Sequence, residues 1–415
     1  MMRNKQYLIN LSIFFAGAFP SIIDAKENQL SWGFSNEYSH NNNKNLSTQR
    51  AYISSTYFKP NFAYLRRSEV SSFQFGMFGN IERHSDTSYN RENGSGNFRY
   101  SQAFENGTLN FSYSFSEQST REISFEETGV FTNEPVITES LAASGTLYHS
   151  ERSAISVNVS FKERDYQSTR FSDYTYLNSG LSWSYALSEH LSTKLNISYN
   201  EYVSDFVLID DRLAPPIVFQ TENFSDSIAA QIGITGRLGE KINYSVLTGG
   251  TYTEQEQFNK SFLLNSAASS ISDSSLSSDN NSNLTSSNIE YSGELSRISF
   301  SISHNQQPTG NGLLIESTST SLSFAYRISG YEEFSASLAA NRQAQSNKEI
   351  EGRFDLEREF AFVSLSYSKR LSENWKLTSL VRYRAQRYKI RPDDIAKGIR
   401  GSLSLQFSPK SLRWK

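Results

Sequence analysis

The chain has 415 residues, of which 37% are hydrophobic and 13% aromatic, and its net charge is −3. The absence of cysteine excludes a disulfide framework and thiol chemistry. The sequence has no basic run, and its aromatic residues fall on the apolar side of strand-like segments, so nothing indicates a nucleic-acid partner.

Residues 1–25 have the pattern of a secretory signal peptide. Arg3 and Lys5 precede an apolar region, and a polar stretch begins after Ala25. This order is typical of a Sec export signal with cleavage after Ala25, although an uncleaved N-terminal anchor would look similar. We therefore expect a signal peptide over 1–25 and a single mature domain over 26–415.

From Leu30 onward, apolar and polar residues alternate in about eighteen segments. The hairpin Tyr176–Tyr202 is the clearest, because Leu181 and Trp183 alternate with serines before a polar turn at 188–190. Successive strand side chains point to opposite faces, so each segment has one apolar face and one polar face. The polar face is too rich in Ser and Asn for a packed core. In chain order the segments are 30–39, 52–66, 72–81, 96–104, 108–116, 141–147, 155–161, 176–187, 191–202, 228–238, 242–252, 289–295, 298–302, 322–328, 334–340, 363–371, 375–383 and 399–407.

Two hairpins also predict their own register. In the Tyr176–Tyr202 hairpin, a three-residue turn places apolar residues opposite one another on a single face. In the second hairpin, Asn106-Gly107 is the preferred dipeptide of a type I′ turn. The expected pairs are Leu181–Ile197, Trp183–Leu195 and Leu187–Leu191 in the first hairpin, and Phe98–Phe115, Tyr100–Tyr113 and Phe104–Leu109 in the second.

Short and long connections alternate along the whole chain. Tight turns of two to five residues alternate with polar connections near 117–136, 163–174, 203–222, 253–283, 304–313, 341–358 and 387–394. This asymmetry is typical of bacterial outer-membrane barrels, which have short periplasmic turns and long external loops. We therefore predict an all-β fold: a single transmembrane, antiparallel, up-and-down β-barrel of about 18 strands, with both termini in the periplasm. The Ser/Asn-rich tract within 253–283 is expected to be flexible, and either to plug the pore or to stand outside it.

Enzymatic motifs are absent from the sequence. His84-Ser85-Asp86 has the letters of a triad, but adjacent loop residues cannot form a nucleophile–base–orienter geometry. His40, His84, His149, His190 and His304 are all expected to be solvated loop or turn residues. Asp210-Asp211 and Glu126-Glu127 are better explained as surface charge than as Ca²⁺ ligands. We predict no catalytic residue, no metal site and no cofactor.

The polar face of the strands supplies the candidate functional residues. Charged side chains on a pore wall set ion or solute selectivity, although a wall of paired charges without selectivity is an equal alternative. Arg382 and Arg384 are alternate residues of one strand, and we expect them to form a basic ladder that contacts an anionic solute or polymer. The predicted lumen residues are Lys162, Arg164, Lys194, Asn196, Arg237, Asn243, Glu290, Glu294, Arg370, Lys376, Arg382 and Arg384.

Two features recur through the mature chain: long Tyr/Ser-rich strands, such as Ser182-Trp183-Ser184-Tyr185, and Leu-Ser-Glu turns, such as Leu371-Ser372-Glu373. In these features the chain resembles the outer-membrane β-barrel porins found with exopolysaccharide and exosortase loci. One departure is that the last strand reaches Phe407, but the chain continues to Trp414-Lys415.

The resemblance implies a conduit for exopolysaccharide export across the bacterial outer membrane. Its implied partners are the polysaccharide, periplasmic export components, the outer-membrane assembly machinery and membrane lipid. A general diffusion porin for small solutes is the alternative function. A structural or adhesive protein with a plugged lumen is a third.

Overall fold

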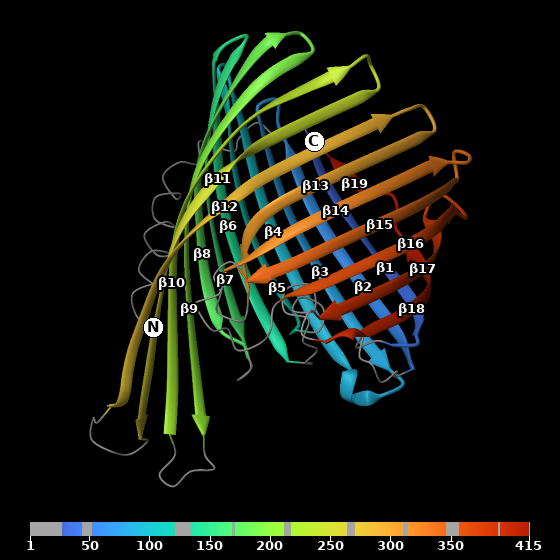
Figure 1. Ribbon diagram of the computed structural model, residues 1–415. Helices are drawn as coiled ribbons and strands as arrows, with labels where there is room; N and C mark the ends of the chain where they lie inside the picture. Colours follow the sequence, from blue (N-terminus) through green and yellow to red (C-terminus); the bar gives the residue numbers. More distant parts are fainter. Residues whose placement is uncertain are drawn as a thin grey trace.

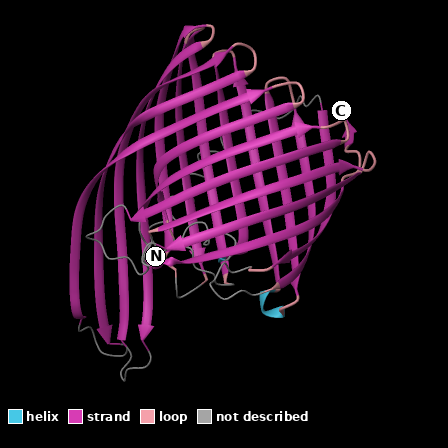
Figure 2. Cartoon of the chain, turned by 45° about the vertical axis from the view of Figure 1, so that its right-hand side comes forward, coloured by secondary structure: helices cyan, strands magenta, loops and turns pink. Residues whose placement is uncertain are grey.

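The computed structural model describes residues 27–43, 52–120, 134–167, 171–210, 217–263, 270–309, 314–345, 357–388 and 391–414. The predicted signal peptide lies outside these residues. Eighteen long strands form one closed antiparallel barrel (Figures 1 and 2). They are β1 (Glu27–Asn41), β2 (Ile53–Arg67), β3 (Ser71–His84), β4 (Arg91–Phe104), β5 (Gly107–Ser119), β6 (Pro135–Ser150), β7 (Ser153–Tyr166), β8 (Asp173–Ser188), β9 (Leu191–Asp210), β10 (Ile217–Leu238), β11 (Ile242–Leu263), β12 (Ser270–Ser292), β13 (Ser296–Pro308), β14 (Leu314–Arg327), β15 (Glu332–Gln345), β16 (Arg358–Arg370), β17 (Trp375–Tyr388) and β18 (Arg391–Phe407).

The barrel closes where the last long strand meets the first. Phe34 of β1 lies opposite Phe407 of β18, and β1 pairs with β2 on its other side. A short strand, β19 (Leu412–Trp414), pairs with the start of β1. The chain beyond Phe407 therefore returns to the sheet, and both described ends lie at the end of the barrel that carries the short turns. One 3-10 turn, η1 (Thr87–Tyr89), connects β3 to β4.

The two faces of the barrel differ as the alternation predicts. Ile228, Ile232 and Leu403 face outward and are 59%, 60% and 52% exposed, whereas serine and threonine dominate the inner face. An apolar outer band with a polar interior is the arrangement that lipid requires of a barrel. No helix among the described residues is long and apolar enough to cross a membrane.

Two expected registers need correction. In the β8–β9 hairpin, Leu181–Ile197 and Trp183–Leu195 pair as predicted, but an irregularity between Ala186 and Ser188 removes the Leu187–Leu191 pair. In the β4–β5 hairpin, Phe98 lies opposite Tyr113, Tyr100 opposite Phe111 and Phe104 opposite Gly107. The register is shifted by two residues, because Glu105-Asn106 forms the turn and Gly107 already belongs to the strand. A side chain at position 107 would clash with the carbonyl oxygen of Thr146, because its Cβ would lie closer than van der Waals contact allows.

The predicted long connections are shorter than expected on one side of the barrel. Strands β9 to β12 extend beyond the others, at the lower left of Figure 1. The tract expected as a flexible loop over 253–283 is instead the far ends of β11 and β12, paired from Thr253–Asn280 to Phe262–Ser270. The described part of this tract continues the wall as paired strands and does not fold across the lumen. We call β9 to β12 the extended sector, and β13 to β17 the short sector.

Candidate functional site

A group of cations lies on the inner face where the barrel closes. Arg382 and Arg384 occupy the face of β17 opposite to Val381 and Tyr383, whose side chains are 54% and 39% exposed on the outside. Arg400 of β18 lies directly opposite Arg382 in the sheet. The strands therefore bring three guanidinium groups together at mid-wall.

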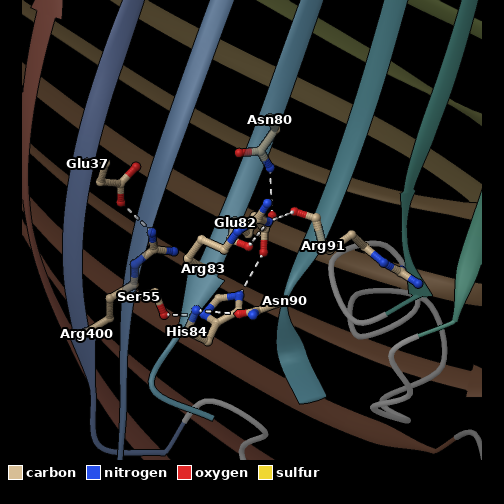
Figure 3. Close-up of polar contacts among 9 residues, drawn as sticks. All are labelled: Glu37, Ser55, Asn80, Glu82, Arg83, His84, Asn90, Arg91 and Arg400. Carbon is tan, nitrogen blue, oxygen red and sulfur yellow. Dashed lines mark hydrogen bonds and ion pairs between the residues drawn. The ribbon is translucent and has the colours of Figure 1, made fainter. Parts of the chain in front are cut away.

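The carboxylate of Glu37 stands beside these cations. Glu37 of β1 accepts from Arg400 Nη2 at 2.5 Å and from Lys59 Nζ of β2 at 2.8 Å. Figure 3 shows Arg400 reaching Glu37 from the neighbouring strand. Arg382 and Arg384 lie on the next strand, so this region carries four cations, two of which form ion pairs with Glu37.

Aromatic rings lie against three of these cations. The Arg382 guanidinium lies 5.3 Å from the Phe362 ring centroid, and the Arg400 guanidinium lies 5.5 Å from that of Tyr57. Lys59 Nζ also lies over Tyr57, at 4.9 Å. Contacts of this kind attract the cation to the face of the ring and hold the side chain against the wall. The Lys59 side chain remains 40% exposed, so its charge still faces the lumen.

The wall formed by β6 to β8 carries a second basic pair. Lys162 Nζ and the Arg164 guanidinium lie 5.6 Å and 5.5 Å from the ring of Tyr174. Arg164 also donates from Nε to Thr138 Oγ1 at 3.2 Å. Arg164 is 6% exposed and Tyr174 only 2%, so this pair is covered.

The remaining predicted lumen residues occupy scattered positions. Lys194, Asn196, Arg237, Asn243 and Glu290 lie at inner-face positions of β9 to β12, and Asn243 pairs with both Arg237 and Glu290. Arg370 and Lys376 lie opposite each other beside a short turn. Glu294 is in the turn between β12 and β13, so it does not belong to the strand wall.

Three residues of this site were not predicted from the sequence: the cations Arg400 and Lys59, and the carboxylate Glu37. Arg400 shares the polar face with Ser402, so the alternation of the last strand carried the signal. For Lys59, the following Pro60 disturbs the alternation of β2; pairing with β3 skips both residues. Glu37 sits among polar residues of β1, where its contact with Arg400, 363 residues away, has no local signature.

A second polar cluster surrounds His84 on β3 (Figure 3). His84 Nδ1 lies 2.6 Å from Ser55 Oγ, and Nε2 lies 3.1 Å from Glu82 Oε2. Asn80 donates to the other Glu82 oxygen at 2.6 Å, and the His84 amide donates to Asn90 Oδ1. His84 is therefore not the solvated loop residue that we expected; it is 7% exposed.

The Ser55, His84 and Glu82 side chains form a chain of hydroxyl, imidazole and carboxylate. The Ser55 residue is 2% exposed and Glu82 is 1% exposed, which leaves a substrate no access to the hydroxyl. Buried polar groups that satisfy one another fix local structure. We interpret this cluster as a structural tie between β2 and β3.

Metal chemistry finds no support in the described part of the chain, where no group of three or more His, Asp or Glu side chains could hold an ion. Asp211 and Glu126-Glu127, considered above as Ca²⁺ ligands, lie outside the described residues.

Comparisons with known proteins support the fold. No family model matches the sequence, and no curated protein matches it. The ferric yersiniabactin uptake receptor FyuA from Yersinia pestis has a similar structure, with a TM-score of 0.53 and 10% identity. The match covers 92% of this chain and 66% of the receptor, so the chain spans slightly less than two thirds of that protein.

Two Pseudomonas aeruginosa structures are more distant. OpdK with vanillate matches with a TM-score of 0.44 and 9% identity, over 93% of this chain and 99% of OpdK. OccK2 (OpdF) in complex with glucuronate matches with a TM-score of 0.43 and 10% identity, over 92% of this chain and 98% of OccK2. The fold of this chain is that of an outer-membrane β-barrel.

Proposed function

We propose that the protein is a non-enzymatic outer-membrane channel for anionic solutes, exported by the Sec pathway, with its short turns and both termini in the periplasm. The observation that carries this proposal is the group of Arg382, Arg384, Arg400 and Lys59 on the inner face where the barrel closes, with Glu37 paired to two of them. Fixed cations on a low-dielectric wall raise the local concentration of anions and exclude cations. The channel needs no cofactor for this.

Export of an anionic exopolysaccharide is the form of this function that the family resemblance favours. In that form the polymer and periplasmic export components would be partners. A general diffusion porin for small solutes is the second candidate. It is favoured by one observation: the far ends of β13 and β14 lie inside the barrel, where Leu314 packs among Tyr166, Tyr174 and Tyr202 of β7 to β9. A polymer needs a wider path than a small solute does.

Charge reversal tests the proposal directly. In the variant with Arg382→Glu and Arg384→Glu, the lumen cations give way to carboxylates. We expect liposome swelling with small carboxylates to slow at least about tenfold, while swelling with neutral sugars changes little. Arg413→Glu, on β19 at the short-turn end, is the matched control because its side chain is 65% exposed outside the basic group. Equal uptake of carboxylates by both variants would refute anion selection.

Added acidic polysaccharide separates the two forms of the function. Block of the ion current by the polymer from the periplasmic side, with no block by a neutral polymer of equal length, supports export. An ion current that neither polymer reduces supports a porin for small solutes. A folded barrel without any conductance would instead support a structural or adhesive protein.

A further inference from the structure

The barrel wall splits between β12 and β13. These strands pair only from Ser292–Arg297 to Thr285–His304. Beyond that point β12 continues along β11 to Ser270, whereas β13 runs on to Pro308. The two strands therefore separate in the half of the barrel away from the short turns, and belong there to different layers.

The far end of β13 lies behind the extended sector, inside the lumen. Gln306 continues the outward side of Ile302 and His304, yet its Oε1 accepts from Thr253 Oγ1 at 2.8 Å. Thr253 is on the inner face of β11 and is fully buried. An outer-face residue can reach an inner-face residue of another strand only if β13 has bent inward. We call residues 304–309 and 314–317 the tip.

Two further contacts seat the tip against the wall formed by β6 to β9. Tyr202 of β9 donates its hydroxyl hydrogen to the Thr309 carbonyl oxygen at 2.9 Å. Leu314, 4% exposed, packs in one cluster with Val136 and the rings of Tyr166 and Tyr202. The tip thus spans from its own wall at β13 and β14 to the wall at β6 to β9.

The contact with the extended sector is polar and incompletely satisfied. Around Thr253, the inner face consists of Ser, Thr, Asn and Gln side chains that are 8% exposed or less. Three of their buried atoms have no hydrogen-bond partner within the described structure: Asn223 Oδ1, Ser225 Oγ and Gln255 Nε2. A buried polar atom without a partner loses its hydration and gains nothing in return. Water would satisfy these atoms if the tip moved away, so their hydration favours release of the tip.

From this arrangement we propose that the tip is the gate of the channel. Seated, it lies over the inner face of β11 at Thr253 and packs against Tyr174 and Tyr202; released, it uncovers this inner face and widens the path. Both positions can be populated, because the closed state carries unsatisfied polar groups that the open state does not. This inference rests on the proposed channel function.

A reversible cross-link tests the gate. The chain has no cysteine, so the variant with Thr253→Cys and Gln306→Cys can be joined by a short reducible bismaleimide. We expect the cross-linked protein to lose most of its conductance and to recover it severalfold on reduction. The control joins Ser301→Cys to Ser321→Cys, whose hydroxyls lie 2.7 Å apart on β13 and β14, and leaves the tip free.

The outcomes separate the gate from the channel. Conductance that is the same before and after reduction of the Thr253–Gln306 cross-link overturns the gate and leaves the channel standing. A folded barrel that conducts in neither state overturns the channel, and the gate with it.

A labelling experiment tests the gate without a conductance measurement. A single Thr253→Cys thiol is buried under the seated tip, and a water-soluble thiol reagent can reach it only when the tip is released. Tyr202→Phe removes the bond to Thr309, and the loss of one hydrogen bond should speed labelling about two- to tenfold. Tyr176→Phe, which loses a bond of 2.8 Å to Asn200 instead, should leave the rate unchanged. Equal rates in all three backgrounds would show a permanently fixed tip and overturn the proposal.

Discussion

The extended and short sectors use the same alternation to build different walls. Strands β9 to β12 have 20 to 23 residues, whereas β13 to β17 have 13 or 14. On β10 the unbroken run of apolar outer residues ends at Ile228, where Asp226 follows, and on β17 it ends at Ala385, where Arg387 follows. Beyond them, β10 and β11 continue because each pairs on both sides along its whole length. Strand length outside the lipid is therefore set by neighbours, and the alternation sets only the part inside.

The sectors also differ in which face carries their polar interactions. In the short sector, serines pair across the inner face: Ser303 with Ser319 at 2.7 Å and Ser337 with Ser364 at 2.6 Å. In the extended sector, carboxylates gather on the outer face, where Asp226 lies opposite both Glu201 and Glu254. Like charges that face each other across strands are destabilising, so the extended sector carries a local cost that the short sector avoids.

The largest expected effect comes from filling a close approach within the extended sector. The Cβ of a residue at position 233 would lie 1.9 Å from the Val246 carbonyl oxygen of β11. Gly233→Val should cost about 3 kcal/mol or more and prevent the folded, heat-modifiable band on gels. At Gly401 of β18 nothing lies within 4 Å, so Gly401→Val should fold normally. Normal folding of both variants would show that position 233 tolerates a larger side chain as well as position 401 does.

The next effect concerns the contact between the sectors. Leu314→Ala should weaken the seat of the tip by about 2 to 4 kcal/mol, because it empties a site that is only 4% exposed. Backbone hydrogen exchange over residues 304–309 should rise, while thermal unfolding of the barrel stays nearly unchanged. Leu276→Ala on β12, where the side chain is 37% exposed, is the control. Unchanged exchange would mean that the tip does not depend on this cluster.

A smaller effect should appear beside the extended sector, beyond the apolar outer band, where Asp173 of β8 lies opposite Asp205 of β9. Burial raises the pKa of Asp173 to about 6, and the nearby carboxylates of Asp165, Asp205 and Glu163 act in the same direction, against the Tyr166 amide that donates to it. The folded state then holds a proton that the unfolded state has lost between about pH 4 and 6, so stability falls as the pH rises through this window.

Asp173→Asn should therefore stabilise the barrel at pH 7 by about 1 kcal/mol, after allowance for solvent screening. The amide oxygen can keep the bond from Tyr166 N–H. Urea unfolding at pH 3.5 and pH 7 measures the change, which should vanish at the lower pH. A gain of equal size at both pH values would assign the effect to packing and not to charge.

The smallest effect is expected in the short sector. Ser303→Ala removes one hydroxyl pair from a solvated inner face and should cost about 0.5 kcal/mol in urea unfolding. A loss of more than about 2 kcal/mol in unfolding free energy would contradict this, because it would make the serine pairs a main source of stability in the short sector.

The transmembrane part of this structure could be predicted because alternation is local. Arg382 and Arg384 lie on the face that period two assigns to them, and the Leu181–Ile197 pair follows from the same rule. Strand β12 could not be predicted in this way, since Ser, Asn and Asp fill both of its faces and its pairing with β11 supplies the order. The two-residue shift at Phe98–Tyr113 has a similar origin, because a shift by two leaves both faces unchanged.

The site was predicted in part for the same reason. A contact such as Arg400–Glu37 depends on closure of the barrel, and the inward bend of β13 at Gln306 depends on the split from β12. Neither has a pattern along the chain. Both became visible only when strands far apart in the sequence were placed side by side.

The zero-current potential of the refolded wild-type protein in a planar bilayer, under a tenfold gradient of potassium chloride, tests the central claim most directly. A channel whose wall carries Arg382, Arg384, Arg400 and Lys59 should give the sign of chloride selectivity. A potential of the opposite sign would contradict an anion-selective lumen, since it would mean that potassium passes this wall more easily than chloride.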